Sequence, residues 1–187
     1  MKQQSSSKII LVDLDGPLAD LEGEFLKRWK VKFPGEFFLA FEERKNFFLR
    51  DDYPEHLKLK IDEILREKGF FADLPAVPGG LEALKTLHAT GYTIIICTSD
   101  IFANPTGLMD KRNWVRTHLD DTFAKAMIFT RDKTLIRGDY LIDDRPTIIG
   151  ALEPAWEHVI FDQPFNRNIT GTKRMNPDWS NWRELFT

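Results

Sequence analysis

Residues 9–20 read Ile-Ile-Leu-Val-Asp-Leu-Asp-Gly-Pro-Leu-Ala-Asp, and this stretch decides the predicted fold. Its apolar run is typical of a buried strand, and the strand ends in Asp13 and Asp15 before a Gly-Pro break. Side chains alternate along a strand, so the two carboxylates point to the same side and repel each other. A divalent cation would relieve that repulsion, and Mg²⁺ is the natural candidate. By itself, a strand that ends in Asp-x-Asp-Gly is also typical of a simple turn.

The composition is that of a globular protein with a full hydrophobic core. The chain has 187 residues, of which 42% are hydrophobic, enough for one domain or a domain with a small insert. The net charge of −3 argues against a nucleic-acid polymer as partner, because no surplus of basic side chains can neutralise its phosphates. A small phosphorylated ligand needs only one or two cations and is compatible with this charge.

Cysteines, histidines and hydrophobic runs argue against three further features. Cys97 is the single cysteine, so an internal disulfide is excluded and a cytoplasmic, reducing compartment fits. The four histidines are far apart and show no ligand spacing, which argues against a zinc site. No hydrophobic run approaches the roughly 20 residues that span a membrane, and the first residues lack the apolar core of a signal peptide. We therefore expect a cytoplasmic protein with no membrane partner.

Predicted strands alternate with helical patterns along most of the chain. Leu81, Leu84 and Leu87, for example, form an apolar stripe at helical spacing just before one of the strands. Such alternation predicts an α/β fold with a Rossmann-like, mostly parallel sheet, in which ligands bind beyond the carboxyl ends of the strands. The predicted strands cover residues 8–14, 92–98, 126–130, 140–143 and 158–161.

The connection after the first strand is too long for an ordinary loop. It contains two helical patterns, over residues 20–32 and 54–68, separated by an aromatic stretch. Long loops without structure are rare, so we expect a small helical cap over residues 19–75, inserted into an α/β core formed by residues 1–18 and 76–187. Because it leaves the sheet directly after the aspartate pair, the cap should cover the site, although an insertion without function is an alternative. A final helix over residues 176–187 should pack onto the core.

Three later strand ends carry polar groups that fit the same chemistry. Thr98 and Ser99 offer hydroxyl groups to phosphate oxygens, and Lys133 offers a positive charge. Asp143 and Asp144 form a second acidic pair that could complete a metal site. Taken singly, each group is also explained as a helix cap or a surface residue. Together, they predict a metal-assisted phosphate site.

The motifs in this order resemble those of the haloacid dehalogenase-like (HAD-like) phosphohydrolases. Longer strings are similar to the 5′(3′)-deoxyribonucleotidases, a cytosolic and mitochondrial branch of that superfamily, and the similarity extends over residues 8–161. The strings are Asp-Leu-Asp-Gly-Pro-Leu-Ala-Asp at 13–20, Ile-Cys-Thr-Ser at 96–99, Thr-Arg-Asp-Lys-Thr at 130–134 and Leu-Ile-Asp-Asp-Arg-Pro at 141–146. The resemblance implies a HAD-like fold and a Mg²⁺-dependent nucleotidase.

The resemblance also implies a role for each motif residue. Asp13 would be the nucleophile that takes the phosphoryl group, and Asp15 would be the general acid and then the general base. Mg²⁺ would be bound by Asp13, the backbone carbonyl of Asp15 and Asp143, with Asp144 in support. The phosphate would be held by Thr98, Ser99 and Lys133.

The cap is implied to choose the substrate. The family equivalents of Phe47 and Phe48 line an apolar pocket for the base and the deoxyribose, where a base can stack on an aromatic face. The chain departs from the family pattern at three positions, where Leu21 and Leu65 replace aromatic residues and Phe48 stands at a variable position that is often Trp. These departures leave the base preference open. Three cations, Arg44, Lys111 and Arg131, are candidates to reach sugar or phosphate oxygens.

We therefore expect a phosphomonoesterase that acts on (deoxy)ribonucleoside monophosphates through an aspartyl-phosphate intermediate. A nucleoside monophosphate is the expected partner, and a homodimer is a candidate assembly. The main alternative is a HAD-type phosphatase of another small phosphate ester, such as a sugar phosphate. A receiver-type signalling module would place the acceptor, Thr and Lys in a different order, and a catalytically inactive scaffold would lack one of the four motif residues.

Overall fold

In the computed structural model, which describes residues 7–100 and 104–186, a six-stranded parallel sheet forms the core. The strand order is β3-β2-β1-β4-β5-β6, so the first strand lies in the middle and the order reverses beside it. The predicted parallel α/β sheet is therefore confirmed. The strands are β1 (Ile9–Val12), β2 (Thr93–Thr98), β3 (Ile128–Phe129), β4 (Tyr140–Asp143), β5 (Glu157–Phe161) and β6 (Lys173–Met175).

The central strands are buried, as their apolar sequences require. In β1, Ile10, Leu11 and Val12 are all fully inaccessible to solvent, and this strand pairs with both β2 and β4. Two strand predictions were inaccurate in length, because the segment 8–14 forms a strand only from Ile9 to Val12, and 126–130 only at Ile128–Phe129. The short edge strand β6 was missed because its three residues include two cations and give no hydrophobic pattern.

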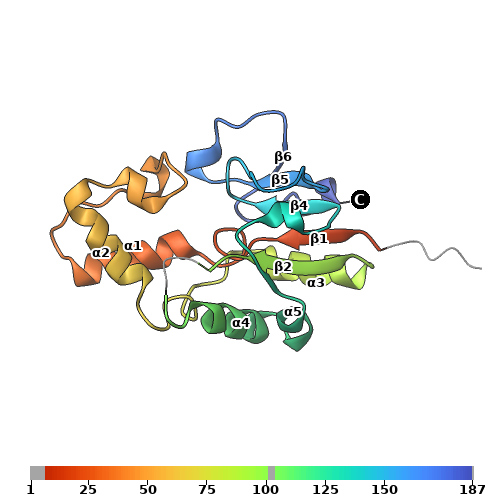
Figure 1. The fold of residues 1–187 in the computed structure, drawn as a ribbon, viewed down its shortest axis with the longest axis horizontal. Coiled ribbons are helices and arrows are strands. Elements are labelled where there is room, and N and C mark those ends of the chain that lie inside the picture. Colours follow the sequence, from red (N-terminus) through yellow and green to blue (C-terminus); the bar gives the residue numbers. More distant parts are fainter. Residues whose placement is uncertain (1–6, 101–103, 187) are drawn as a thin grey trace, which may run out of the picture.

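Helices surround the sheet and extend beyond one end of it. Figure 1 shows α1 and α2 beyond the carboxyl ends of the strands, away from the helices that pack beside the sheet. Within residues 7–100 and 104–186, no helix has the length and hydropathy that a membrane span requires. The α-helices are α1 (Leu21–Lys32), α2 (Lys58–Leu65), α3 (Gly80–Ala89), α4 (Gly107–His118), α5 (Asp121–Lys125) and α6 (Trp182–Leu185), and the 3₁₀ helices are η1 (Phe41–Glu43), η2 (Leu49–Asp52), η3 (Glu55–Leu57), η4 (Lys133–Leu135) and η5 (Pro164–Asn166).

The chain leaves and re-enters the core at one place. Ala19 forms an antiparallel bridge with Ala76, the Asp20 N–H donates to the Pro75 carbonyl over 2.8 Å, and the Val77 N–H donates to the Leu18 carbonyl over 2.8 Å. The two chain segments that connect residues 19–76 to the core are therefore hydrogen-bonded to each other. The predicted cap of residues 19–75 stays a prediction, and this pairing supports its boundaries.

The segment between Ala19 and Ala76 packs on itself and shares one hydrophobic cluster with the sheet. The side chain of Asp20 caps α1 by accepting a hydrogen bond from the Gly23 N–H over 2.9 Å. Fully buried Phe25 and Trp29 of α1 belong to the same hydrophobic cluster as Ile61 and Ile64 of α2. The second predicted helix, 54–68, is split into η3 and the shorter α2, which ends at Leu65.

The predicted C-terminal helix over 176–187 is wrong for most of its length. Only Trp182–Leu185 are helical, and residue 187 lies outside the described residues. Trp179 has a φ of 60°, a left-handed conformation that a right-handed helix cannot contain. Its buried indole N–H instead donates to the Pro17 carbonyl over 2.8 Å. The tail therefore packs onto the core, as predicted, and supports the loop that follows β1.

Candidate active site

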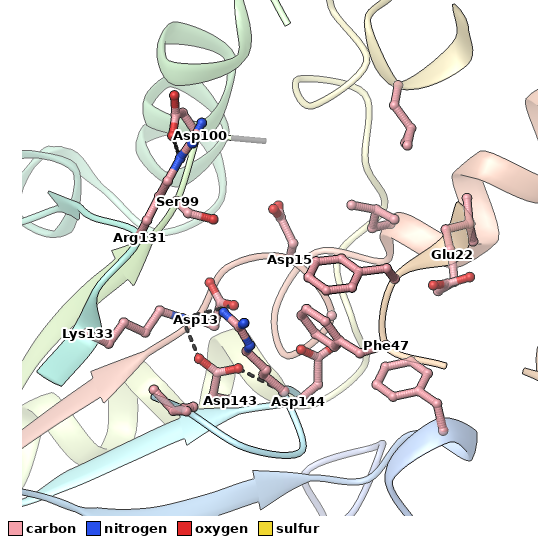
Figure 2. Close-up of a pocket in the computed structure, with 18 of the residues that line it drawn as sticks. Asp13, Asp15, Glu22, Phe47, Ser99, Asp100, Arg131, Lys133, Asp143 and Asp144 are labelled. Atoms are coloured by element: carbon pink, nitrogen blue, oxygen red, sulfur yellow. Dashed lines mark hydrogen bonds and ion pairs between the residues drawn. The ribbon is translucent and has the colours of Figure 1, made fainter. Parts of the chain in front are cut away.

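A cavity of about 460 Å³ lies where the strand ends face α1 and the segment that follows it. Its position matches the rule that ligands of parallel sheets bind beyond the carboxyl ends of the strands, at the point where the strand order reverses. Figure 2 shows Asp13, Lys133 and Asp143 at one end of this cavity and Phe47 and Glu22 at the other. We call these the phosphate end and the cap end.

Three carboxylates meet at the phosphate end. Each of Asp13, Asp143 and Asp144 offers an oxygen that lies within 4.8 Å of the oxygens of the other two. Sheet pairing causes this meeting, because β1 lies beside β4 and the Asp13 N–H donates to the Ile142 carbonyl over 2.8 Å. The two acidic pairs of the sequence are thus adjacent in space, as the hypothesis of a shared cation requires.

Lys133 lies between two of these acids. It belongs to η4, which follows β3, and its ammonium is 3.0 Å from Asp13 Oδ2 and also pairs with Asp143 Oδ2. Burial is the largest single influence and lowers the pKa of Lys133, but Asp13 and Asp143 together outweigh it and raise that pKa above its ordinary value. Lys133 is therefore a fixed positive charge that the carboxylates hold at the phosphate end.

One ammonium does not neutralise three acids. Burial, opposed by Lys133 and reinforced by Asp143, raises the pKa of Asp13 to about 6. Burial and the charges of Asp143 and Asp13 also raise the pKa of Asp144 well above its ordinary value. Clustered carboxylates with raised pKa values are the environment that a divalent cation with oxygen ligands fits.

Gly16 makes room for this cluster. It has a φ of +93°, and a side chain at this position would overlap the carboxylate of Asp144. A glycine is therefore required at this position for steric reasons, because it lets the loop after β1 pack against Asp144, which follows β4.

Asp15 is held by a cation from another element. Its Oδ2 accepts a hydrogen bond over 2.6 Å from Lys111 of α4, and this ammonium also donates to Thr98 Oγ1 over 3.2 Å and to the Ser99 carbonyl over 2.6 Å. Lys111 is only 1% exposed. The other carboxylate oxygen of Asp15 is buried and has no hydrogen-bond partner among the described residues.

The structure brings most of the predicted site residues to the cavity. Three of the predicted residues do not line it within the described part of the chain, because Thr98 and Lys111 lie behind Asp15 and Arg44 is buried in ion pairs with Glu22 and Asp52. Those that do line it are Asp13, Asp15, Leu21, Phe47, Phe48, Ser99, Arg131, Lys133, Asp143 and Asp144. Arg131 is 75% exposed and pairs with Asp100 over 2.8 Å.

The cap end is mostly apolar. The ring centroids of Phe47 and Phe48 are 5.1 Å apart, and the ring planes make an angle of 69°. The ring centroids of Phe47 and Phe165 are 5.8 Å apart, with an angle of 78° between the planes. Leu21 and Leu65, the two positions where aromatics were expected, also line the cavity. The apolar surfaces of these side chains suit a flat, largely apolar group of a ligand.

Several residues that line the cavity were not predicted as site residues, among them Arg145, Phe165 and Glu22. Arg145 follows the second acidic pair, and its guanidinium lies 5.4 Å from the Phe47 ring centroid. Its place directly after Asp143-Asp144 was an available signal. Phe165, which follows β5, and Glu22, at the start of α1, gave no signal, because only the tertiary fold brings them to the cavity.

A comparison of the sequence with protein families gives one match over nearly the whole chain. The model of a family described as "5′ nucleotidase, deoxy (Pyrimidine), cytosolic type C protein" matches residues 7–186. A Bordetella pertussis protein, provisionally named a 5′(3′)-deoxyribonucleotidase, is 44% identical over 178 residues and covers 95% of each chain. The human "5′(3′)-deoxyribonucleotidase, cytosolic type" is 38% identical over 186 residues, covering 95% of this chain and 92% of its own.

Solved structures share the fold at low sequence identity. A haloacid dehalogenase-like hydrolase from Streptococcus pneumoniae superposes with a TM-score of 0.59 at 10% identity, covering 97% of this chain and 99% of its own. A second haloacid dehalogenase-like protein, from Burkholderia xenovorans, gives a TM-score of 0.54 at 16% identity and covers 96% of both chains. These similarities identify the fold as HAD-like and carry no information on the substrate.

Proposed function

We propose that this chain, which belongs to the 5′-nucleotidase, deoxy (pyrimidine), cytosolic type C family, hydrolyses (deoxy)ribonucleoside monophosphates with Mg²⁺ through an aspartyl-phosphate intermediate. The family resemblance read from the sequence and the HAD-like fold are both confirmed. The observation that carries the proposal is the meeting of Asp13, Asp143 and Asp144 beside Lys133 at one end of a cavity whose other end is aromatic.

The donor set at the phosphate end fits a magnesium ion. Asp13 and Asp143 would hold it together with the carbonyl oxygen of Asp15, and Asp144 would support it. When bound, Mg²⁺ supplies positive charge that offsets the repulsion between a carboxylate and a phosphate dianion. Burial first, and then the neighbouring carboxylates, raise the pKa values of Asp13 and Asp144, and a bound cation would favour the ionised form of both groups.

The contacts of Asp13 support its proposed role as the nucleophile. One of its oxygens accepts the Leu14 N–H over 2.8 Å and the other faces Lys133 at 3.0 Å, so the carboxylate has a fixed orientation. Attack on phosphorus would form the aspartyl phosphate and release the sugar oxygen, and water would then cleave the acyl phosphate. Lys133 would stabilise charge that spreads over the phosphoryl oxygens in both steps.

Asp15 is placed to move protons. In this proposal Oδ1, which has no hydrogen-bond partner among the described residues, would give a proton to the leaving sugar oxygen, while Lys111 holds Oδ2 in place. The same oxygen would then accept a proton from the attacking water. Lys111 was predicted to contact substrate oxygens, but its present contacts support a positioning role instead. The role of Thr98 in phosphate binding stays a prediction, because its hydroxyl accepts from Lys111 in this structure.

The cap end supports a nucleoside as the leaving group. Phe47, Phe48 and Phe165 offer ring faces and edges to a base, whereas a sugar phosphate would leave this end without a matching group. The human relatives are named for cytosolic and mitochondrial forms of a 5′(3′)-deoxyribonucleotidase. We also propose a cytoplasmic location, which the cytosolic relative supports. A homodimer stays a prediction that sedimentation would test.

A phosphate-release assay tests the proposal. The full chain should release inorganic phosphate from deoxyribonucleoside monophosphates when Mg²⁺ is present and lose that activity when the metal is chelated. Acid quenching during turnover should trap phosphate covalently on the wild-type protein but not on Asp13→Asn. Turnover of sugar phosphates in preference to every nucleotide would contradict the substrate class, and turnover without any covalent phosphate on Asp13 would contradict the mechanism.

A further inference from the structure

A carboxylate lies at the cap end of the cavity, where the surrounding side chains are apolar. Glu22 belongs to the first turn of α1, its side chain is 13% exposed, and it lines the cavity. In Figure 2, Glu22 lies beyond Phe47, away from Asp13 and Lys133. A carboxylate in this position has no place in the phosphate chemistry and needs another explanation.

Arg44 forms a hydrogen bond with only one of the two carboxylate oxygens of Glu22. The buried guanidinium of Arg44 pairs with Glu22 Oε1, donates to Asp52 Oδ2 over 2.6 Å and donates to the Asn46 carbonyl over 2.8 Å. Each of its three nitrogens therefore already has an acceptor. The guanidinium carbon also lies 5.5 Å from the ring centroid of Phe165. The hydrogen bonds of the described residues include none to the second oxygen of Glu22, Oε2, and the Glu22 side chain lines the cavity.

The charge of this group is also unbalanced. Arg44 contributes one positive charge, whereas Glu22 and Asp52 contribute two negative charges. Burial is the main cause that raises the pKa of Glu22, and Arg44 opposes it. Arg44 and Asp52 alone would form a neutral ion pair, so Glu22 adds a negative charge to a group that borders the cavity.

We propose that Glu22 is a specificity-determining residue whose Oε2 accepts a hydrogen bond from an N–H group of the nucleotide base. The inference rests on the proposed function, because it needs a nucleotide in the cavity. Phe47 and Phe165 provide apolar surroundings that strengthen such a bond, since water competes less for the acceptor. A base without an N–H donor would leave the carboxylate desolvated and unpaired, which disfavours binding.

Base analogues test this without any mutation. We would measure kcat/KM for the four natural deoxyribonucleoside monophosphates, then for the best of them with its base N–H donors replaced by N-methyl groups. The wild-type protein should prefer the natural nucleotide by on the order of ten-fold to a hundred-fold. Equal kcat/KM for the methylated analogue would overturn the proposal. If none of the four natural nucleotides were hydrolysed, the proposed function itself would be rejected.

Two variants separate recognition from structure. In Glu22→Gln, the amide oxygen can still accept from Arg44, but an amide N–H₂ replaces the acceptor that faces the cavity. This variant should lose the preference for the natural base and should hydrolyse 2-deoxyribose 5-phosphate at the wild-type rate. The matched control is Asp52→Asn, which perturbs the same Arg44 but keeps Glu22 and should keep the preference. Equal losses on nucleotide and deoxyribose phosphate in Glu22→Gln would show a structural role only and overturn the proposal.

Discussion

The two ends of the cavity are built by different parts of the chain and hold their charges differently. At the phosphate end, every acid lies at the end of a core strand or directly after it, and Lys133 and Lys111 are buried among them. At the cap end, the lining comes from the ends of helices, a bend and 3₁₀ segments, and the described ion pairs there are centred on Arg44. The difference indicates that chemistry and substrate choice can vary independently in this molecule.

The largest effect should come from the phosphate end and should not depend on the substrate. Asp13→Asn removes the nucleophile and should lower kcat by about 10⁴-fold or more for nucleotides and 2-deoxyribose 5-phosphate alike. Thermal unfolding should show a folded protein, because the amide is isosteric. A variant that kept wild-type turnover would remove Asp13 from the mechanism.

Metal removal should act on the same end and show a pH dependence. A carboxyl whose pKa is raised on folding stabilises the protein at low pH, and that contribution is lost as pH rises through the folded value, about 6 for Asp13. Mg²⁺ should therefore raise Tm clearly at pH 7.5 and much less at pH 5, where protons compete for the ligands. Calorimetric scans with Mg²⁺ and with a chelator measure this. The same Tm gain at both pH values would argue against a carboxylate site.

Lys111 should affect the rate more than substrate binding. Lys111→Met leaves Asp15 without its ion pair, and we expect kcat to fall by about 10²-fold while KM changes little. Lys111→Arg should restore part of kcat, since it returns a cation to Asp15. A rise in KM with unchanged kcat would instead support the original prediction that Lys111 contacts the substrate.

Phe165 tests the cap end by itself. Phe165→Ala removes a ring that meets Phe47, and KM for nucleotides should rise by about ten-fold, within the range known for base stacking. Activity on 2-deoxyribose 5-phosphate should not change, because that substrate has no base. The control is Phe38→Ala, which changes a cap aromatic that does not line the cavity within the described residues. Equal effects of the two variants would refute a role of Phe165 at the cap end.

The smallest effect should come from the exposed link between core and cap. Arg167 and Glu42 form an ion pair over 2.6 Å, but their side chains are 48% and 66% exposed. Solvent screens such pairs, so Arg167→Ala should change stability by less than about 1 kcal/mol and leave both substrates unaffected. A large change in KM would show that this pair controls cap closure.

Sequence reasoning succeeded where neighbouring residues and strand periodicity carry the information. It predicted the parallel sheet and the proximity of Asp13, Asp143, Asp144 and Lys133, because each lies at or shortly after the end of a predicted strand. It failed at β6 and at the tail, where the strand is too short for a pattern and Trp179 takes a left-handed conformation.

The sequence by itself predicted which residues gather at the phosphate end, because the carboxyl ends of parallel strands lie at one edge of the sheet. Only the tertiary structure decided which side chains contact the phosphate-end residues and which line the opposite end of the cavity. Lys111 reaches Asp15 from 96 positions away, and Phe165 meets Phe47 although no local pattern relates the two. Such contacts depend on how helices and loops pack around the sheet, and packing is a property of the whole fold rather than of any stretch of sequence.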